Sequence, residues 1–156
     1  MRLEVTRRSD IAVRALLALE EADGRITAAE LGERIDASPK FVPHAVGPLV
    51  TAGWVTSDPG RTGGYALATP LDDISLRDVV ECIEGPIDSG RCVVAKRPCS
   101  ADAPCALHLA WTNARRHLVD NLASTAMSSL RGLARNGCFP TSAQHGDGGS
   151  TAGSRS

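Results

Sequence analysis

Two helix starts set close together limit most strongly how this chain can fold. Thr27 can accept a hydrogen bond from the free amides of a helix, and Glu30 can complete a capping box with it. Ile26, just before the cap, can pack against Leu31 in the first helical turns. These residues predict a short helix that starts after Thr27 and ends near Ile35.

A tight turn, Asp36-Ala-Ser38-Pro39, follows this helix. Ser38 suits an N-cap and Pro39 suits the first position of a helix, so a further helix is predicted to start there. Two short helices joined by such a turn form a helix-turn-helix, in which the second helix enters the major groove of DNA. Pro43 and Pro48 fall inside that second helix, which is therefore expected to be kinked or irregular.

The segments on either side complete a winged helix. Residues 6–22 carry an apolar stripe that predicts a helix, closed by Gly24. Strand-forming residues at 54–57 and 65–69 flank a turn-rich segment, which predicts a hairpin, or wing, with Arg61 at its tip. The residues predicted to face DNA are Ser38, Pro39, Lys40, Phe41, His44, Arg61, Thr62, Gly63 and Gly64. On the residues alone, Lys40 and His44 also suit an ordinary solvated surface.

The second half of the chain is predicted to be helical and to serve assembly. Ser75 and Asp78 repeat the capping pattern, which predicts a helix to about Glu84, where Gly85 and Pro86 break it. From residue 105 to 130 apolar residues recur every three or four positions, which predicts one long helix packed against a second copy of the chain. The predicted divisions are a winged helix-turn-helix domain at 1–69, a cysteine loop and dimerisation helix at 70–137, and a disordered tail at 138–156.

Three cysteines and a histidine converge between the last two predicted helices. Cys92, Cys99, Cys105 and His108 have the spacing C-x6-C-x5-C-x2-H within seventeen residues. Thiolates select zinc or iron-sulfur clusters, and the lack of a C-x2-C knuckle disfavours structural zinc. An iron-sulfur cluster is therefore the preferred interpretation, with zinc, ordinary thiols or a simple redox pair as alternatives.

Composition indicates the compartment and excludes several classes of protein. Five cysteines, three of them in one loop, argue for a reducing cytoplasm and against a disulfide framework; Cys82 is expected to pack in the core and Cys138 to be a bystander. No apolar run approaches the ~18 residues of a membrane span, so we expect a soluble protein without a membrane partner. The net charge of -1 means that DNA binding depends on locally placed Arg and Lys. The sequence has no evident catalytic constellation, such as Ser/His/Asp or paired carboxylates, so we do not expect an enzyme.

Taken together, these motifs resemble the Rrf-type winged-helix transcription regulators of bacteria, which include the IscR-like and NsrR-like iron-sulfur regulators. The resemblance covers about residues 1–133. It is carried by Met1-Arg-Leu, the stretch 38–53, Gly63-Gly64-Tyr65 with Leu67, Asp78-Val79-Val80, Glu84-Gly85 and the three spaced cysteines. It implies a mostly α-helical fold with a small β-hairpin wing and a long dimerisation helix. It also implies a homodimer that binds a palindromic promoter.

The same resemblance implies a ligand set for the cluster. Cys92, Cys99 and Cys105 look like the three cluster thiolates. The stretch Cys105-Ala-Leu-His108-Leu-Ala-Trp is similar to the IscR-like pattern in which histidine completes a 2Fe-2S site, and this is the favoured assignment. The N-terminal Arg-Ser-Asp10 instead resembles the NsrR-like pattern, in which an aspartate from the other subunit completes a 4Fe-4S site. His108 is expected one helical turn after Cys105, on one rigid element.

Two departures from the family pattern concern DNA binding. Pro59-Gly60 stands where many relatives have Arg-Gly, so Arg61 has to contact phosphate or a groove alone, and the two prolines of the second helix are unusual. The predicted function is a dimeric transcription regulator whose affinity for its operator is controlled by an iron-sulfur cluster that senses redox state, nitric oxide or iron-sulfur status. The alternatives are a winged-helix DNA-binding adaptor with a zinc-filled or empty cysteine site, and a small redox protein, which would have no use for a wing.

Overall fold

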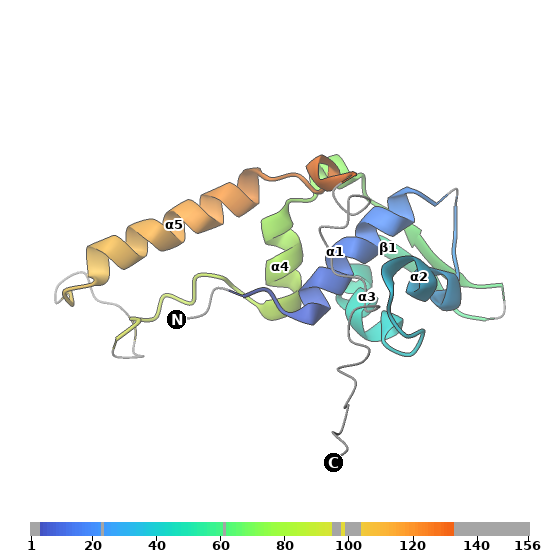
Figure 1. Cartoon of the computed structure of the whole chain (residues 1–156), viewed down its shortest axis with the longest axis horizontal. Helices are drawn as coiled ribbons and strands as arrows, with labels where there is room; N and C mark the ends of the chain where they lie inside the picture. The colour runs from blue at the N-terminus through green and yellow to red at the C-terminus, as the bar shows by residue number, and fades with distance from the viewer. Residues whose placement is uncertain (1–3, 23, 61, 95–97, 99–103, 133–156) are drawn as a thin grey trace, which may run out of the picture.

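The computed structural model describes residues 4–22, 24–60, 62–94, 98 and 104–132. These residues form a mostly helical molecule with one two-stranded sheet, as predicted (Figure 1). The elements are α1 (Arg7–Glu20), α2 (Ala28–Ile35), α3 (Val42–Thr51), β1 (Val55–Asp58), β2 (Gly64–Leu67), η1 (Leu71–Asp73), α4 (Leu76–Glu84), α5 (His108–Ser124) and η2 (Met127–Leu130). Among the described helices, none combines the length and the apolar character that crossing a membrane requires.

The core lies around α1, whose buried side chains include Ile11, Leu16 and Leu19. The short helices α2 and α3 pack against it through Leu31 and Leu49, among other buried residues. Both of these leucines are fully buried, so the helix-turn-helix packs on an apolar core formed within the same chain.

Both predicted capping boxes are confirmed. The Glu30 amide donates to Thr27 Oγ1 at 3.2 Å, and the Glu30 carboxylate accepts from the Thr27 amide at 2.7 Å. Ser75 and Asp78 make the same reciprocal pair at 3.1 and 3.0 Å, and α4 ends at Glu84 as expected. Each pair satisfies amides that the first turn of a helix leaves without intrahelical partners.

The start of α3 differs from the prediction. Ser38 does not cap the helix and Pro39 is not its first residue, because the helix begins at Val42 with Phe41 in the N-cap position. The Ser38 carbonyl instead accepts from the Phe41 amide at 2.8 Å, closing a turn. Pro43 therefore lies in the first helical turn, where a missing amide costs nothing, and only Pro48 is inside the helix.

The wing is an antiparallel hairpin in which Val55 pairs with Leu67 and Asp58 with Gly64. An isolated bridge between Ile26 and Tyr65 attaches β2 to the segment just before α2. The wing and the helix-turn-helix therefore form one continuous body.

The predicted helix from 105 to 130 is shorter than expected. α5 ends at Ser124, and the chain then becomes extended at Thr125. The Met127 amide donates to the Ile74 carbonyl at 2.8 Å, and the Met127 side chain is completely buried. The end of the apolar stripe thus belongs to the core of its own chain. Figure 1 shows α5 extending away from the body from this point.

Candidate nucleic-acid interface and cysteine site

The predicted DNA-facing residues of the helix-turn-helix do not all lie on its surface. Ser38, Pro39, Lys40 and His44 are exposed or partly exposed. Phe41 is half-buried and packs against the core, and its ring meets the His44 ring edge-on with centroids 5.5 Å apart. Phe41 therefore supports the position of His44 from below, while the exposed side chains are available to a ligand.

The two glycines of the wing have a structural role that the sequence did not reveal. A Cβ on Gly63 would lie 2.1 Å from the Asp58 carbonyl oxygen, and one on Gly64, with φ of 151°, would lie 2.2 Å from the Ile26 carbonyl oxygen. Only glycine allows these approaches. Thr62, beside them, is exposed, and Arg61 lies outside the described residues.

Arg25 holds the turn end of the wing, and the sequence analysis did not identify it. Its guanidinium donates to the Gly64 carbonyl at 2.9 Å and pairs with the Asp58 carboxylate at 2.9 Å. The only signal in the sequence is its position directly before Ile26, which pairs with the second strand. Arg25 therefore ties the two strands together next to the turn, where its charge is paired with Asp58.

Two of the predicted cluster thiolates lie side by side. The sulfur atoms of Cys92 and Cys105 are 3.8 Å apart, and both residues are half-buried. Together with His108 and Trp111 they line a cavity of about 220 Å³. Cys99, the third predicted thiolate, lies outside the described residues. Within those residues no three His, Cys, Asp or Glu side chains are placed so that they could hold a metal ion.

The prediction that His108 and Cys105 lie on one helix is wrong. α5 begins at His108, and Cys105 lies in the turn before it. The His108 amide donates to the Cys105 carbonyl at 2.9 Å, so the turn still joins the two residues.

An ion pair ties the cysteine segment to α5. Asp88 accepts from the Gly90 amide at 2.9 Å and from the Arg115 guanidinium at 2.7 Å. The hydrogen bond from Gly90, followed by the one from Arg115, holds the pKa of the Asp88 carboxyl below its usual range. Sequence reasoning missed this pair because the two residues are 27 positions apart. Asp88 and Arg115 also line the cavity that contains the thiols.

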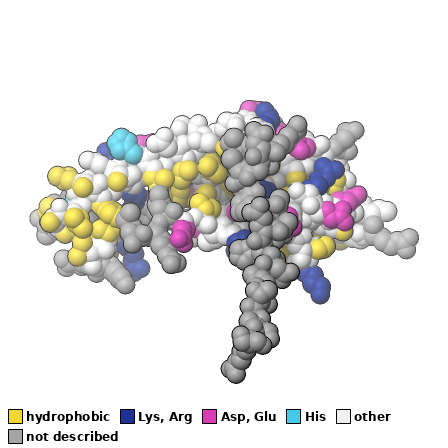
Figure 2. Space-filling view, viewed as in Figure 1, with side chains coloured by type: hydrophobic (Ala, Val, Ile, Leu, Met, Phe, Trp, Pro, Cys, Tyr) yellow, Lys and Arg dark blue, Asp and Glu magenta, His cyan; other side chains and the backbone are white. Residues whose placement is uncertain are grey.

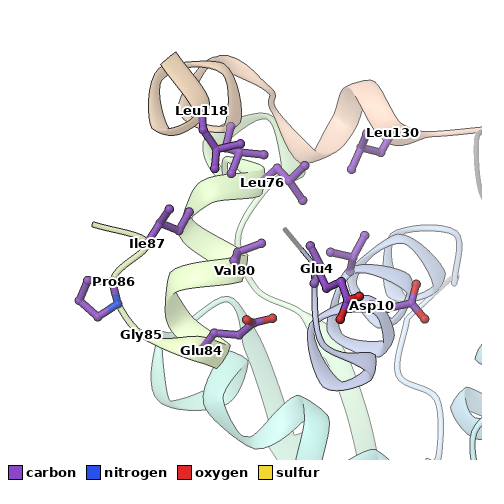
Figure 3. Close-up of a pocket in the computed structure, with 13 residues that line it drawn as sticks. Glu4, Asp10, Leu76, Val80, Glu84, Gly85, Pro86, Ile87, Leu118 and Leu130 are labelled. Atoms are coloured by element: carbon purple, nitrogen blue, oxygen red, sulfur yellow. The ribbon is translucent and has the colours of Figure 1, made fainter. Parts of the chain in front are cut away.

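Asp10 lies at a different cavity. Its carboxylate pairs with Arg14 at 2.7 Å, and Arg14 also donates to the Ile35 carbonyl at the end of α2, at 2.5 Å. The Asp10 cavity is an apolar groove of about 580 Å³ between α1, α4 and α5. Figure 3 shows Leu118 and Val80 arranged around it, with Asp10 at its edge.

Cys82 packs against the core, as predicted, on the face of α4 that meets α3. Its thiol lies 3.5 Å from the Pro48 carbonyl oxygen, and burial raises its pKa. A thiol that stays protonated is a poor nucleophile and a poor metal ligand. Cys138 lies outside the described residues.

A helix-turn-helix joined to a hairpin wing defines a winged-helix protein. A family model named Rrf2 and described as an iron-dependent transcriptional regulator matches residues 5–132. The chain therefore belongs to the Rrf2 family of transcriptional regulators, and it is not an enzyme. DNA binding follows from membership of this family.

Three known proteins illustrate the relationship. NMA1593 of Neisseria meningitidis, named as an HTH-type transcriptional regulator, is 30% identical over 137 residues, which cover 86% of this chain and 92% of the relative. The HTH-type transcriptional regulator IscR of Photobacterium profundum is 30% identical over 111 residues, which cover 70% of this chain and 64% of IscR. The solved structure of CymR, the global cysteine regulator of B. subtilis, matches with a TM-score of 0.67 at 24% identity, covering 83% of this chain and 96% of CymR.

Proposed function

We propose that this protein is a cytoplasmic, homodimeric regulator that binds a palindromic promoter with an affinity set by an iron-sulfur cluster. Cys92, Cys99, Cys105 and His108 are its proposed ligands. The observation that carries the proposal is the 3.8 Å separation of the Cys92 and Cys105 sulfurs beside a cavity that His108 also lines. Family membership and the similarity to IscR support it.

The residues present fit such a group. Two thiols and an imidazole are soft and borderline donors of the kind that hold iron-sulfur clusters. A bound cluster would supply a centre that gains or loses electrons and reacts with nitric oxide. The chain's own contribution is to bring the donors together, and the Asp88–Arg115 ion pair helps by fixing the cysteine segment against α5. Arg115 also places a positive charge beside donors that bind as thiolates.

His108 remains our preferred fourth ligand, in a 2Fe-2S site. It lines the same cavity as Cys92 and Cys105, whereas Asp10 of the same chain lines a separate groove and is paired with Arg14. Asp10 from a partner subunit, in a 4Fe-4S site, is the alternative that the family resemblance supports. His108→Ala and Asp10→Ala, compared by their cluster spectra, distinguish the two.

The proposed DNA surface consists of the turn before α3, the exposed side of α3 and the wing. Lys40, His44 and Thr62 are exposed there, together with Ser38 and Pro39. Arg61, at the tip of the wing, is proposed to contact phosphate or a groove. Phe41, Gly63 and Gly64 shape this surface, because their contacts are with the protein itself.

The proposed dimer uses α5 and the apolar groove beside it. No residue of α5 is buried, and Leu118 and Leu122 line the groove of about 580 Å³. Figure 2 shows apolar side chains gathered at the end of the molecule where α5 begins, where Leu107 and Leu109 are exposed. A second copy of α5 would remove this apolar surface from water.

A thiol-based regulator without a cluster is the second candidate. The close approach of the Cys92 and Cys105 sulfurs favours it, because a small backbone shift would bring them to the disulfide length of about 2.05 Å. Zinc in the same site is a further form of this alternative.

Anaerobic purification of the full-length protein, followed by an absorption spectrum and iron, sulfide and zinc analysis, tests the proposal. We expect visible charge-transfer bands that disappear in Cys92→Ser, Cys99→Ser and Cys105→Ser. Cys82→Ser and Cys138→Ser are matched controls and should keep the bands. A colourless protein that contains zinc, or that forms a reversible Cys92–Cys105 disulfide, would contradict the proposal and support the second candidate.

A further inference from the structure

Pro48 leaves a gap in the hydrogen bonding of α3. Residue 48 lies inside the helix, at the position whose amide would normally donate to the carbonyl of His44. Proline has no amide hydrogen, so this intrahelical bond cannot form. An interior proline of this kind usually kinks a helix or weakens it at that turn.

Arg8 of α1 supplies donors at this gap. Its Nε and one terminal nitrogen donate to the His44 carbonyl oxygen at 3.3 and 3.2 Å. The two residues are 36 positions apart, so the contact depends on how α1 and α3 pack. A charged donor gives this carbonyl a stronger partner than a neutral amide would.

α1 and α4 hold α3 together at this turn. Cys82 of α4 donates to the Pro48 carbonyl at 3.5 Å, next to the Arg8 charge. The beginning of α1 is in turn fixed to the end of α4, because Glu84 accepts from the Ser9 hydroxyl at 2.5 Å and from the Thr6 amide at 2.9 Å. Arg8 therefore donates from a turn whose position is itself fixed.

We propose that Arg8 is a positioning residue for α3: it replaces the hydrogen bond that Pro48 removes and so fixes the helix in the orientation that DNA requires. The inference rests on the proposed function, in which α3 enters the major groove. A different role for Arg8, direct contact with a DNA phosphate, would make no use of Pro48.

A double-mutant cycle in the full-length protein separates these roles. Pro48→Ala restores an amide at position 48, so Arg8→Ala should matter only while Pro48 is present. Without DNA, we expect Arg8→Ala to speed amide hydrogen exchange in residues 42–51 by about tenfold, and by about twofold or less in the Pro48→Ala background. Arg8→Lys keeps a charged donor and should restore most of the protection. Arg7→Ala removes the same charge from an exposed neighbour and should change nothing.

DNA affinity is measured with a duplex that the wild-type protein selects from a random pool. Arg8→Ala should weaken binding about tenfold when Pro48 is present and about twofold in the Pro48→Ala background. Equal losses in both backgrounds, or no change in exchange, would overturn the proposal. If Arg8→Ala fails to fold, a folded double mutant supports it and an unfolded double mutant overturns it. Coupled exchange without any change in affinity would instead contradict the placement of α3 on DNA.

Discussion

α1 buries eight of its 14 residues, whereas none of the 17 residues of α5 is buried. The body formed by α1–α4 and the hairpin thus buries its apolar core within a single chain. α5 contacts that body at the groove, and the chain just after it is held at Met127. Much of the apolar surface of α5, including Leu109 with 74% of its area exposed, has no cover within the described chain. We infer that the body folds as a single chain, while the apolar surface of α5 needs a second copy to cover it.

The largest effect, on the assembly of the dimer, should follow from a charge introduced into the apolar surface of α5. Leu118→Glu places a carboxylate in the groove of each subunit, and a buried unpaired charge costs several kcal/mol. We expect loss of the dimer in sedimentation velocity with the helical content of the body retained. Asn113→Glu, at an exposed position of α5, is the control. An intact dimer of Leu118→Glu would show that α5 packs elsewhere.

A substitution in the core around α1 tests whether the body folds without a second copy of the chain. Leu16 is completely buried, so Leu16→Ala should lower the free energy of unfolding by about 2–5 kcal/mol in urea titrations. The loss should be the same at low and high protein concentration, because it does not involve a second copy. Glu33→Ala, exposed on α2, should change stability by less than about 0.5 kcal/mol. A concentration-dependent loss in Leu16→Ala would contradict the comparison.

The smallest effect concerns the ion pair between the cysteine segment and α5. Because the pKa of Asp88 is lowered in the folded protein, its contribution to stability is present above the unfolded-state pKa of about 4 and is lost as the pH falls through the folded-state value. The pair is partly exposed, so we expect at most about 1 kcal/mol. Asp88→Asn should remove this pH dependence from thermal melts, and Glu33→Gln should not. An unchanged pH profile in Asp88→Asn would exclude the pair as its source.

The sequence predicted best what depends on neighbouring residues. Both capping boxes follow from side chains three positions apart, and the end of α4 follows from the adjacent Gly85 and Pro86, so they were predictable. Ser38-Pro39 was misassigned because the same pair suits a turn and a helix start, and packing of Phe41 against the core favours the turn.

The site was less predictable than the fold because its contacts are distant in sequence. The approach of Cys92 to Cys105 agrees with the predicted ligand set, yet the pairing of Asp88 with Arg115 and of Arg25 with Asp58 depends on tertiary packing. The end of α5 was missed for the same reason, since Met127 is held by a backbone bond to Ile74.

The chain just after α5 is held to the body at Met127, so α5 projects from a fixed point. With 17 residues at a rise of about 1.5 Å each, α5 is about 25 Å long, so a rotation of about 5° about its C-terminal end moves its N-terminal end by about 2 Å. The cysteine segment lies at the N-terminal end of α5, and the helix-turn-helix lies on the side of its C-terminal end (Figure 1). Because the N-terminal end of α5 moves most in such a rotation, a spectroscopic label near residue 109 would report a small rotation of α5 relative to the body.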